Sequence, residues 1–348
     1  MAYFIVSRHA DLKLIIDFFT KHPLNTVKYK EFLDFKKAFE LYEGASVKDI
    51  RLKELLDNIR SGMNKQRTDF TLRDQDYVIT PYWLLGFVEG DGSFSIIKKN
   101  YLVRFSLSQS AKDLVLLERI QEFLHKLAID SDVVIKGIDN IMDLIKIYSY
   151  KGSSNQVLYN LQIAHSDFLK YVLIPFFDSL IFLTPSAPAG PQARRGKKKL
   201  DYKDWKAVLK LKEEGHHYSE EGREIIEWIL SQINNNRLTS SRISSPHTEG
   251  EASLFKVRLD KLLSGSSNFE VKEDGRIFIK SLKKYYTSGK TIGVQLQDVN
   301  SETVINSFVS LTECAKFLGM SLSTLHRRIR RNEPVLFENR QYYVKVVG

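Results

Sequence analysis

The chain has 348 residues, of which 43% are hydrophobic, and a formal net charge of +10 at pH 7. A chain of this length can bury more than one core, and its excess of Lys and Arg favours nucleic acid as a partner over a membrane surface. The single cysteine, Cys314, excludes an intrachain disulfide framework and a thiolate-rich zinc site.

The N-terminal residues MAYFIVSRHADL lack the basic region and apolar core of a secretory signal. The longest apolar stretch, residues 171–183, is broken by Pro175 and Asp178 and is too short to cross a bilayer, so no membrane partner is expected. The chain also favours residues with AT-rich codons, such as Ile, Lys, Asn, Phe and Tyr. This bias is common in organellar genomes, and a mitochondrial, organelle-encoded protein is the expectation.

Two parts of the chain resemble each other in the same order. The resembling stretches are 3–19 with 159–177, 27–41 with 199–211, and 52–67 with 222–237. Such a repeat predicts two copies of one half-domain. The first copy, residues 1–72, begins at the last strand of the shared plan, so it is predicted to be partial and to lack an opening helix and early strands.

A short helix with a glycine stripe is predicted within WLLGFVEGDGSF, residues 83–94. Each glycine costs about 1 kcal/mol in a helix interior, yet Gly86 and Gly90 lie one turn apart on the same face. This stripe allows a second helix to approach to backbone contact. Two such helices would bring an Asp91 carboxylate from each to a shared axis, where close carboxylates favour a bound cation such as Mg²⁺.

The stretch after this helix predicts an α+β domain. Residues 101–108 alternate, with Val103, Phe105 and Leu107 on one face of a strand and Arg104 on the other. A helix is expected over 112–127, and further strands over roughly 132–137, 143–150 and 157–164. Helices follow, interrupted by a Pro/Ala/Gly/Arg-rich segment, residues 185–196, which is predicted to be an inserted surface loop.

At this point LLGFVEGDG, residues 84–92, resembles the signature of the LAGLIDADG homing endonucleases. Trp83, the following SF and the repeated half-domains fit that family too, and the resemblance covers about residues 1–240. It implies an αββαββα domain over 80–240, with a saddle-shaped antiparallel sheet that lies in the DNA major groove.

The resemblance also implies roles for single residues. It gives Asp91 the catalytic and metal-binding role, with Gly90 beside it at the metal, and places Glu89 outside that site; the cofactor is Mg²⁺ or another divalent cation. Lys28 and Lys199, or Lys198 beside it, match a basic residue near the active site, and Gln109 is expected to position water. The polar strand face supplies the candidate DNA contacts, which are Ser93, Ser95, Lys99 and Arg104.

A separate C-terminal module is predicted over 254–348, after a Ser/Thr-rich linker at 241–253. A helix over 312–318, a break at Gly319 and a second helix capped by Ser321 or Ser323 predict a helix-turn-helix. The module resembles the modular DNA-binding repeats that follow homing endonucleases. Its candidate DNA contacts lie at the end of the second helix, and they are Arg327, Arg328, Arg330 and Arg331.

The resulting hypothesis is a metal-dependent endonuclease that cuts both strands of a double-stranded DNA site and so promotes intron homing. Two alternatives remain open: an RNA maturase that binds its own intron RNA and assists splicing, and an inactive DNA-binding derivative. The chain shows one motif, whereas a complete site needs two. The second could come from an upstream reading frame or from a homodimer through the motif helix, or the site is half-built.

Overall fold

The computed structural model of the protein describes most of the chain. The described residues are 5–44, 50–72, 77–133, 135, 138, 140–152, 155–183, 197–234, 249–273, 275–286, 293–308, 310–338 and 340–347. The chain divides into two compact units, Met1–Ser266 and Ser267–Gly348. Within the described part, no helix is both long and apolar enough to span a bilayer.

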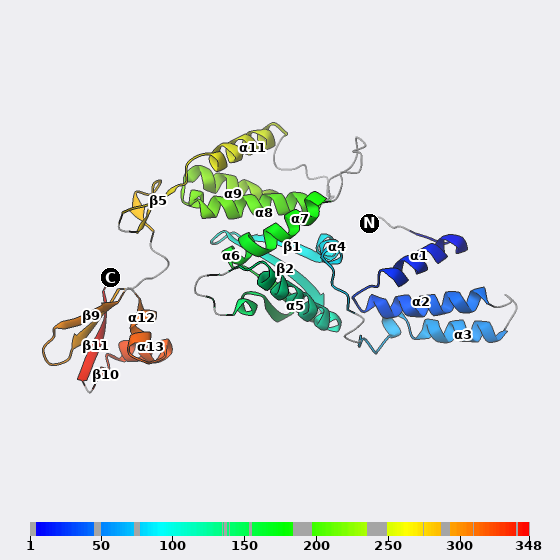
Figure 1. The fold of residues 1–348 in the computed structure, drawn as a ribbon, viewed down its shortest axis with the longest axis horizontal. Coiled ribbons are helices and arrows are strands. Elements are labelled where there is room, and N and C mark those ends of the chain that lie inside the picture. Colours follow the sequence, from blue (N-terminus) through cyan, green and yellow to red (C-terminus); the bar gives the residue numbers. More distant parts are fainter. Residues whose placement is uncertain are drawn as a thin grey trace. The chain divides into compact units, whose positions relative to one another are not determined.

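A helix and a four-stranded antiparallel sheet form the centre of the first unit (Figure 1). The sheet has the strand order β1-β2-β4-β3. Its elements are α4 (Pro81–Asp91), β1 (Gly92–Ile97), β2 (Leu102–Ser110), α5 (Leu114–Asp130), β3 (Lys146–Lys151) and β4 (Val157–Ile163), with 3-10 turns at Ala111–Asp113 and Ile141–Leu144. The predicted α+β fold with an antiparallel sheet is therefore confirmed. The predicted strand at 132–137 is not part of this sheet at its described residues 132, 133 and 135.

Helices complete the first unit. They are α6 (Ser166–Phe168), a π-helical turn (Leu169–Leu173), α7 (Ile174–Leu183), α8 (Lys197–Glu213), a 3-10 turn (His216–Tyr218), α9 (Glu220–Gln232) and α11 (Glu249–Ser264). Helix α11 starts inside the predicted linker 241–253 and packs on α9, where the Phe255 ring stacks on Trp228 with centroids 5.0 Å apart. The second compact unit begins at Ser267. The predicted loop 185–196 lies outside the described residues.

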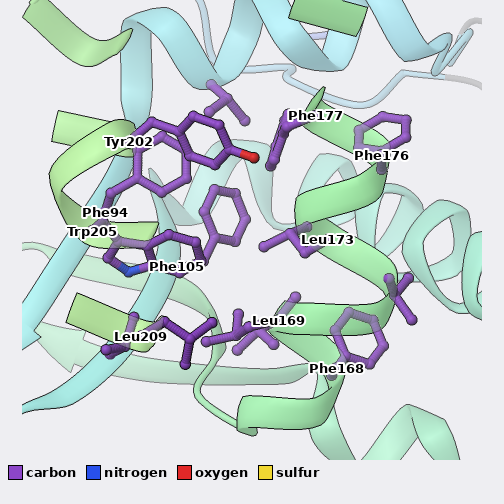
Figure 2. Close-up of a cluster of buried hydrophobic side chains, with 14 of the residues drawn as sticks. Phe94, Phe105, Phe168, Leu169, Leu173, Phe176, Phe177, Tyr202, Trp205 and Leu209 are labelled. Carbon is purple, nitrogen blue, oxygen red and sulfur yellow. The ribbon is translucent and has the colours of Figure 1, made fainter. Parts of the chain in front are cut away.

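The core of this unit lies between the sheet and helices α5, α7 and α8 (Figure 2). The predicted alternation of β2 is confirmed, because Val103, Phe105 and Leu107 are buried in this core. Trp205 on α8 reaches the sheet: its ring lies 5.3 Å from that of Phe94 on β1, and its Nε1 donates to the carbonyl oxygen of Arg104 on β2 at 3.1 Å. One face of the sheet is therefore closed by helices, and the polar face points away from them.

The N-terminal part of the first unit consists of helices. They are α1 (His9–Lys21), α2 (Lys28–Glu43), α3 (Ile50–Ser61) and a 3-10 turn (Asn64–Gln66), packed on a small core of Ile16, Phe32 and Phe39. Residues 5–44 and 50–72, as described, contain no strand. Residues 28–67 align without a gap with 198–237, so α2 corresponds to α8 and α3 to α9.

Two polar contacts join these helices to the sheet domain. The Asn25 side chain, which is buried, accepts from the Val78 backbone N–H at 2.6 Å and donates to the Val78 carbonyl at 2.8 Å. The backbone N–H of Val27 donates to the Asp113 carboxylate at 2.8 Å. Both contacts lie at the start of α2, so the N-terminal end of this helix is held beside the segments that precede α4 and α5.

The matched positions Trp205 and Phe35 predict a large difference in stability between two equivalent substitutions. Trp205 is fully buried and Phe35 is 37% exposed. Trp205→Ala should lower the free energy of unfolding by about 3–5 kcal/mol, because it leaves a cavity and removes the indole hydrogen bond to the Arg104 carbonyl. Phe35→Ala should cost less than about 1 kcal/mol. Denaturant titration measures both values, and equal losses would contradict the assignment of Trp205 to the core.

In its described residues, the second unit contains two small antiparallel sheets and two helices. Its elements are β5 (Phe269–Val271), β6 (Ile277–Ile279), β7 (Lys284–Tyr285), β8 (Gly293–Asp298), β9 (Val304–Phe308), α12 (Leu311–Phe317), α13 (Leu322–Arg331), β10 (Val335–Phe337) and β11 (Arg340–Val347). Gly319 takes a left-handed conformation, φ 64°, in the turn between α12 and α13. The Ser321 side chain caps α13 by accepting from the Thr324 N–H at 3.2 Å. The two helices pack on the sheet β10-β11-β8-β9 around Cys314 and Leu325.

Candidate active site

Helix α4 presents its glycine stripe outward. Thr80 caps the helix by accepting from the Trp83 N–H at 3.2 Å, and Pro81 occupies the first turn, where a missing N–H costs nothing. Leu84 and Val88 anchor the helix in the core. Gly86 and Gly90 are exposed, and a Cβ added to either would meet nothing within 4 Å. Within this chain, therefore, the stripe leaves room for a second helix.

Asp91 ends α4 at the edge of the sheet. The pairing of Gly92 with Leu107 brings the end of β2 beside the helix, and Gln109 Nε2 donates to Asp91 Oδ2 at 2.8 Å. Asp91 and Glu89 are both exposed. Gly92 allows the sharp exit from the helix, because a Cβ there would lie 2.6 Å from the Val88 carbonyl oxygen. The structure thus brings together Asp91 and Gln109, two residues named from the sequence.

A lysine from α8 reaches the same place. Lys198 Nζ donates to the Gly92 carbonyl oxygen, directly after Asp91 in the chain. Lys199, the residue named first from the sequence, is exposed one position further along α8. Adjacent residues on a helix point about 100° apart, so only one of the two lysines reaches this carbonyl. Lys28 of the first copy aligns with Lys198, which is the signal that favours Lys198 over Lys199.

If this corner cleaves DNA, as the sequence leads us to expect, two neighbouring lysines should differ in their effect on cleavage. Lys198→Met should lower the rate of DNA cleavage by about tenfold or more, because a cation near the scissile phosphate offsets developing negative charge. Lys199→Met is the matched control and should leave the cleavage rate within about twofold, since an exposed lysine here contributes at most a phosphate contact. Single-turnover cleavage rates distinguish the two; a larger loss for Lys199→Met would reverse the assignment.

Asp113 is a site residue that the sequence did not indicate. It lies directly before α5 and is only 7% exposed. Its carboxylate accepts from the Val27 N–H instead of capping its own helix. Burial raises the pKa of the Asp113 carboxyl, and the Val27 N–H, Lys112 and Lys28 oppose that rise, while the Asp91 charge adds to it. Asp113 therefore connects the start of α2, with Lys28, to the neighbourhood of Asp91.

The donor atoms at this corner fit part of a divalent metal site. Asp91 supplies one carboxylate, and the Gly90 carbonyl is among the last four of α4, which have no partner within a helix. Mg²⁺ prefers such oxygen ligands and is often held by one or two carboxylates together with substrate phosphate. Among the described residues, no group of three or more His, Cys, Asp or Glu side chains could hold a metal ion. The residues present therefore fit half of a site.

The polar face of the sheet carries a connected set of side chains. Arg104 on β2 donates through Nε to Ser95 Oγ on β1 at 3.1 Å and through Nη1 to Gln162 Oε1 on β4 at 3.3 Å. Ser93 lies on the same face of β1, two residues before Ser95. Lys99 is exposed in the turn between β1 and β2.

Sequence reasoning missed the polar residues of β3 and β4. Ser108 Oγ donates to Asn160 Oδ1 at 3.0 Å, and Asn160 pairs across the sheet with the exposed Tyr148. Lys146 is likewise exposed and pairs with Gln162. The polar face of the sheet thus extends over all four strands. These residues lie in segments predicted as strands, but which of them share a face with Arg104 depends on the register.

The four arginines of α13 fall into two groups. Arg328 donates to the Pro334 carbonyl at 2.7 Å, and Arg331 lies 3.8 Å from Glu333, so both contact the turn that follows the helix. Arg327 and Arg330 are exposed. Arg331 is exposed too, so only Arg328 is held partly buried, and Arg327 and Arg330 are the exposed arginines without a contact to the following turn among the described residues.

Comparison with known proteins finds matches in both the N-terminal helices and the sheet domain. The family model described as LAGLIDADG endonuclease matches residues 1–39 and 84–209. A probable intron-encoded endonuclease, Cox1-I1b of Schizosaccharomyces pombe, is 34% identical over 152 residues, which cover 43% of this chain and 38% of that protein. An uncharacterized mitochondrial protein of Saccharomyces cerevisiae, RF1, is 24% identical over 326 residues, covering 91% of this chain and 63% of that protein. The chain spans less than two thirds of the length of either relative.

Solved structures share the fold. The LAGLIDADG homing endonuclease I-GzeII, determined with its DNA target, aligns with a TM-score of 0.50 and 23% identity, covering 66% of this chain and 75% of that one. A variant of I-SmaMI aligns with a TM-score of 0.50 and 24% identity over the same shares. At this identity the likeness shows the architecture of the two halves.

Proposed function

We propose that this chain, whose residues 1–39 and 84–209 belong to the LAGLIDADG endonuclease family, hydrolyses phosphodiester bonds in a double-stranded DNA target at Asp91. The observation that carries this proposal is the exposed Asp91 at the foot of a helix whose glycine stripe is open to a second helix. A helix without such a role would be more stable with other residues in place of Gly86 and Gly90, since each glycine costs about 1 kcal/mol of helix stability. The relatives' names support a mitochondrial origin and a part in intron homing.

Each residue at this corner has a separate task in the proposed reaction. Asp91 binds a divalent cation with the Gly90 carbonyl. That cation, Mg²⁺ or a similar ion, supplies Lewis-acid stabilisation of the attacking and leaving oxygens. Gln109, hydrogen-bonded to Asp91, orients the carboxylate and a water molecule beside it. Lys198 holds the exit of the helix and places positive charge beside the scissile phosphate.

The polar sheet face binds the DNA in this proposal. Arg104 supplies phosphate contacts or guanine readout, and the Ser and Asn side chains around it are adaptable donors and acceptors. The helices α12 and α13 are proposed to add a helix-turn-helix contact outside the cleavage site, with Arg327 and Arg330 facing the DNA. The net charge of +10 makes this binding strongly dependent on salt, through the release of counterions from the DNA.

A complete cleavage site needs two motif helices, and the sequence shows the motif once. The internal repeat shows where a second motif helix can be added by protein engineering. Tyr3 aligns with Tyr159, so residues 77–158 can be placed a second time ahead of Tyr3, which then follows Leu158 as Tyr159 does. The engineered protein with this added segment is called the extended chain, and it carries two glycine-striped helices and two copies of Asp91.

The nuclease proposal is tested with a randomised library of double-stranded DNA in Mg²⁺. The native chain is incubated with the library over a range of concentrations that would drive two chains to pair through their motif helices. The extended chain is incubated in the same way, and the cut ends are sequenced. Recurrent cut ends that require Mg²⁺ are expected. If neither protein cuts while the native chain binds its intron RNA, the maturase alternative holds and the nuclease proposal is wrong.

A further inference from the structure

The small sheet β5–β7 of the second unit contains a strongly basic hairpin (β5 is labelled in Figure 1). The stretch 276–286, which holds β6, the turn after it and β7, has the sequence RIFIKSLKKYY. It contains no Asp or Glu, and its basic residues are Arg276, Lys280, Lys283 and Lys284, all of them exposed. This basic hairpin is a concentration of positive charge separate from the arginines of α13.

A buried asparagine holds the turn of the basic hairpin. Asn268 is 7% exposed; its Oδ1 accepts from the Ser281 backbone N–H and its Nδ2 donates to Ser281 Oγ, both at 2.9 Å. The Asn268 carbonyl accepts from the Lys280 N–H at 2.9 Å, and the Lys283 N–H donates to the Lys280 carbonyl at 3.3 Å. Lys280 and Lys283 are therefore the ends of one β-turn, and a turn fixed in this way loses little chain entropy when it binds a ligand.

Lys283 has a backbone conformation that disfavours lysine. Its φ is 51°, in the left-handed region where glycine and asparagine are usually found. Glycine has no Cβ to crowd the following carbonyl oxygen, and asparagine compensates through a local hydrogen bond. The turn is therefore less stable with lysine than with either residue, and such strain is common at functional sites. This indicates that the positive charge at position 283 serves a purpose other than folding.

The aromatic face of the same sheet orders further cations. Phe278 on β6 and Tyr285 on β7 pair across the sheet, with ring centroids 5.4 Å apart. The Arg276 guanidinium lies 4.1 Å from the centroid of the Tyr285 ring, and Lys272 Nζ lies 5.1 Å from that of Phe278. Cation–π contacts of this kind hold the charged groups in place on the surface.

We propose that the basic hairpin 276–286 binds the phosphate backbone of double-stranded DNA, as a contact separate from those of the Arg104 sheet face and of α13. Charge complementarity supports this partner, because Lys and Arg side chains supply the phosphate contacts that are independent of sequence. An unpaired RNA base would need an open aromatic ring for stacking, whereas Arg276 lies over the ring of Tyr285. The inference rests on the proposed binding of DNA by this chain.

The test uses the full chain with Lys283→Asn and Lys284→Gln combined. Asparagine suits the left-handed conformation better than lysine, so this hairpin variant should unfold at no lower a temperature than the unchanged chain. The matched control combines Lys256→Gln with Lys261→Gln, which replaces two exposed lysines of α11. Both variants lower the net charge by the same amount, so a difference between them reports on the location of the charge.

Binding to a DNA duplex of mixed sequence is measured over a range of salt concentrations. Each phosphate contact contributes about 0.9 to the slope of the logarithm of the binding constant against that of the salt concentration. The hairpin variant should therefore reduce the magnitude of this slope by about 1.8, and it should bind all sequences more weakly. The control pair should keep the slope of the unchanged chain.

An unchanged slope for the hairpin variant, or an equal decrease for the control pair, would overturn the proposal, as would failure of the unchanged chain to bind the duplex. If the slope is unchanged but the hairpin variant loses binding to a structured RNA or to phosphatidylserine vesicles, that anion is the partner instead. Cleavage does not enter this measurement. A chain that shows the expected slopes but cuts no DNA would contradict the proposed nuclease function and leave this inference standing.

Discussion

Asp91→Asn should abolish cleavage of both DNA strands while DNA binding persists. The amide keeps the size of the side chain and its contact with Gln109, but it removes the carboxylate that is proposed to bind the cation. Metal ions contribute several kcal/mol to such reactions, and about 1.4 kcal/mol corresponds to a factor of ten, so the rate should fall by about a thousandfold. In the extended chain both copies of the aspartate are replaced.

Glu89→Gln is the matched control for this prediction. Glu89 lies two residues earlier on the same helix and is also exposed, so its loss removes the same charge without removing the proposed ligand. Its cleavage rate should stay within about threefold of the unchanged protein, as expected for an exposed charge near the DNA. DNA affinity is compared in Ca²⁺. An Asp91→Asn protein that cuts at the normal rate would remove this acid from the mechanism.

Gly86→Leu should separate stability from activity. In this chain a side chain at Gly86 meets open space, and leucine is a better helix former than glycine, so the free energy of unfolding should rise by up to about 1 kcal/mol. Cleavage should be lost, because the leucine prevents a second helix from reaching backbone contact.

Gly86→Ala calibrates this result. Alanine gives the same gain in helix propensity as leucine but is small enough for close helix packing. Both variants should therefore unfold at similar denaturant concentrations, while Gly86→Ala keeps most of the cleavage activity and Gly86→Leu does not. Equal cleavage by the two variants would mean that no helix packs on this face.

The local patterns of the sequence predicted much of the first unit. The period of two in residues 101–108 placed Val103 and Phe105 in the core because adjacent strand residues point to opposite faces. The glycines of residues 83–94 indicated a helix that is open on one side. Helix α11 was missed, although Phe255, Leu259 and Leu262 recur at helical spacing, because the Ser/Thr-rich stretch before it was extended to residue 253.

The long-range features of the site could not be read from the sequence. The choice between Lys198 and Lys199 depends on the rotation of α8 relative to the sheet, which is set by tertiary packing. The pairing of Asp113 with Val27 joins residues 86 positions apart. The polar residues of β3 and β4 join the face of Arg104 only through the strand register.

The central claim, that Asp91 forms half of a cleavage site completed by a second glycine-striped helix, is tested most directly with the extended chain. Asp91→Asn is introduced at the native position alone, and cleavage of each strand of a selected DNA target is measured in Mg²⁺. With one acid missing, double-strand breaks should disappear, leaving at most a nick in one strand. Double-strand breaks at the rate of the unchanged extended chain would contradict the account.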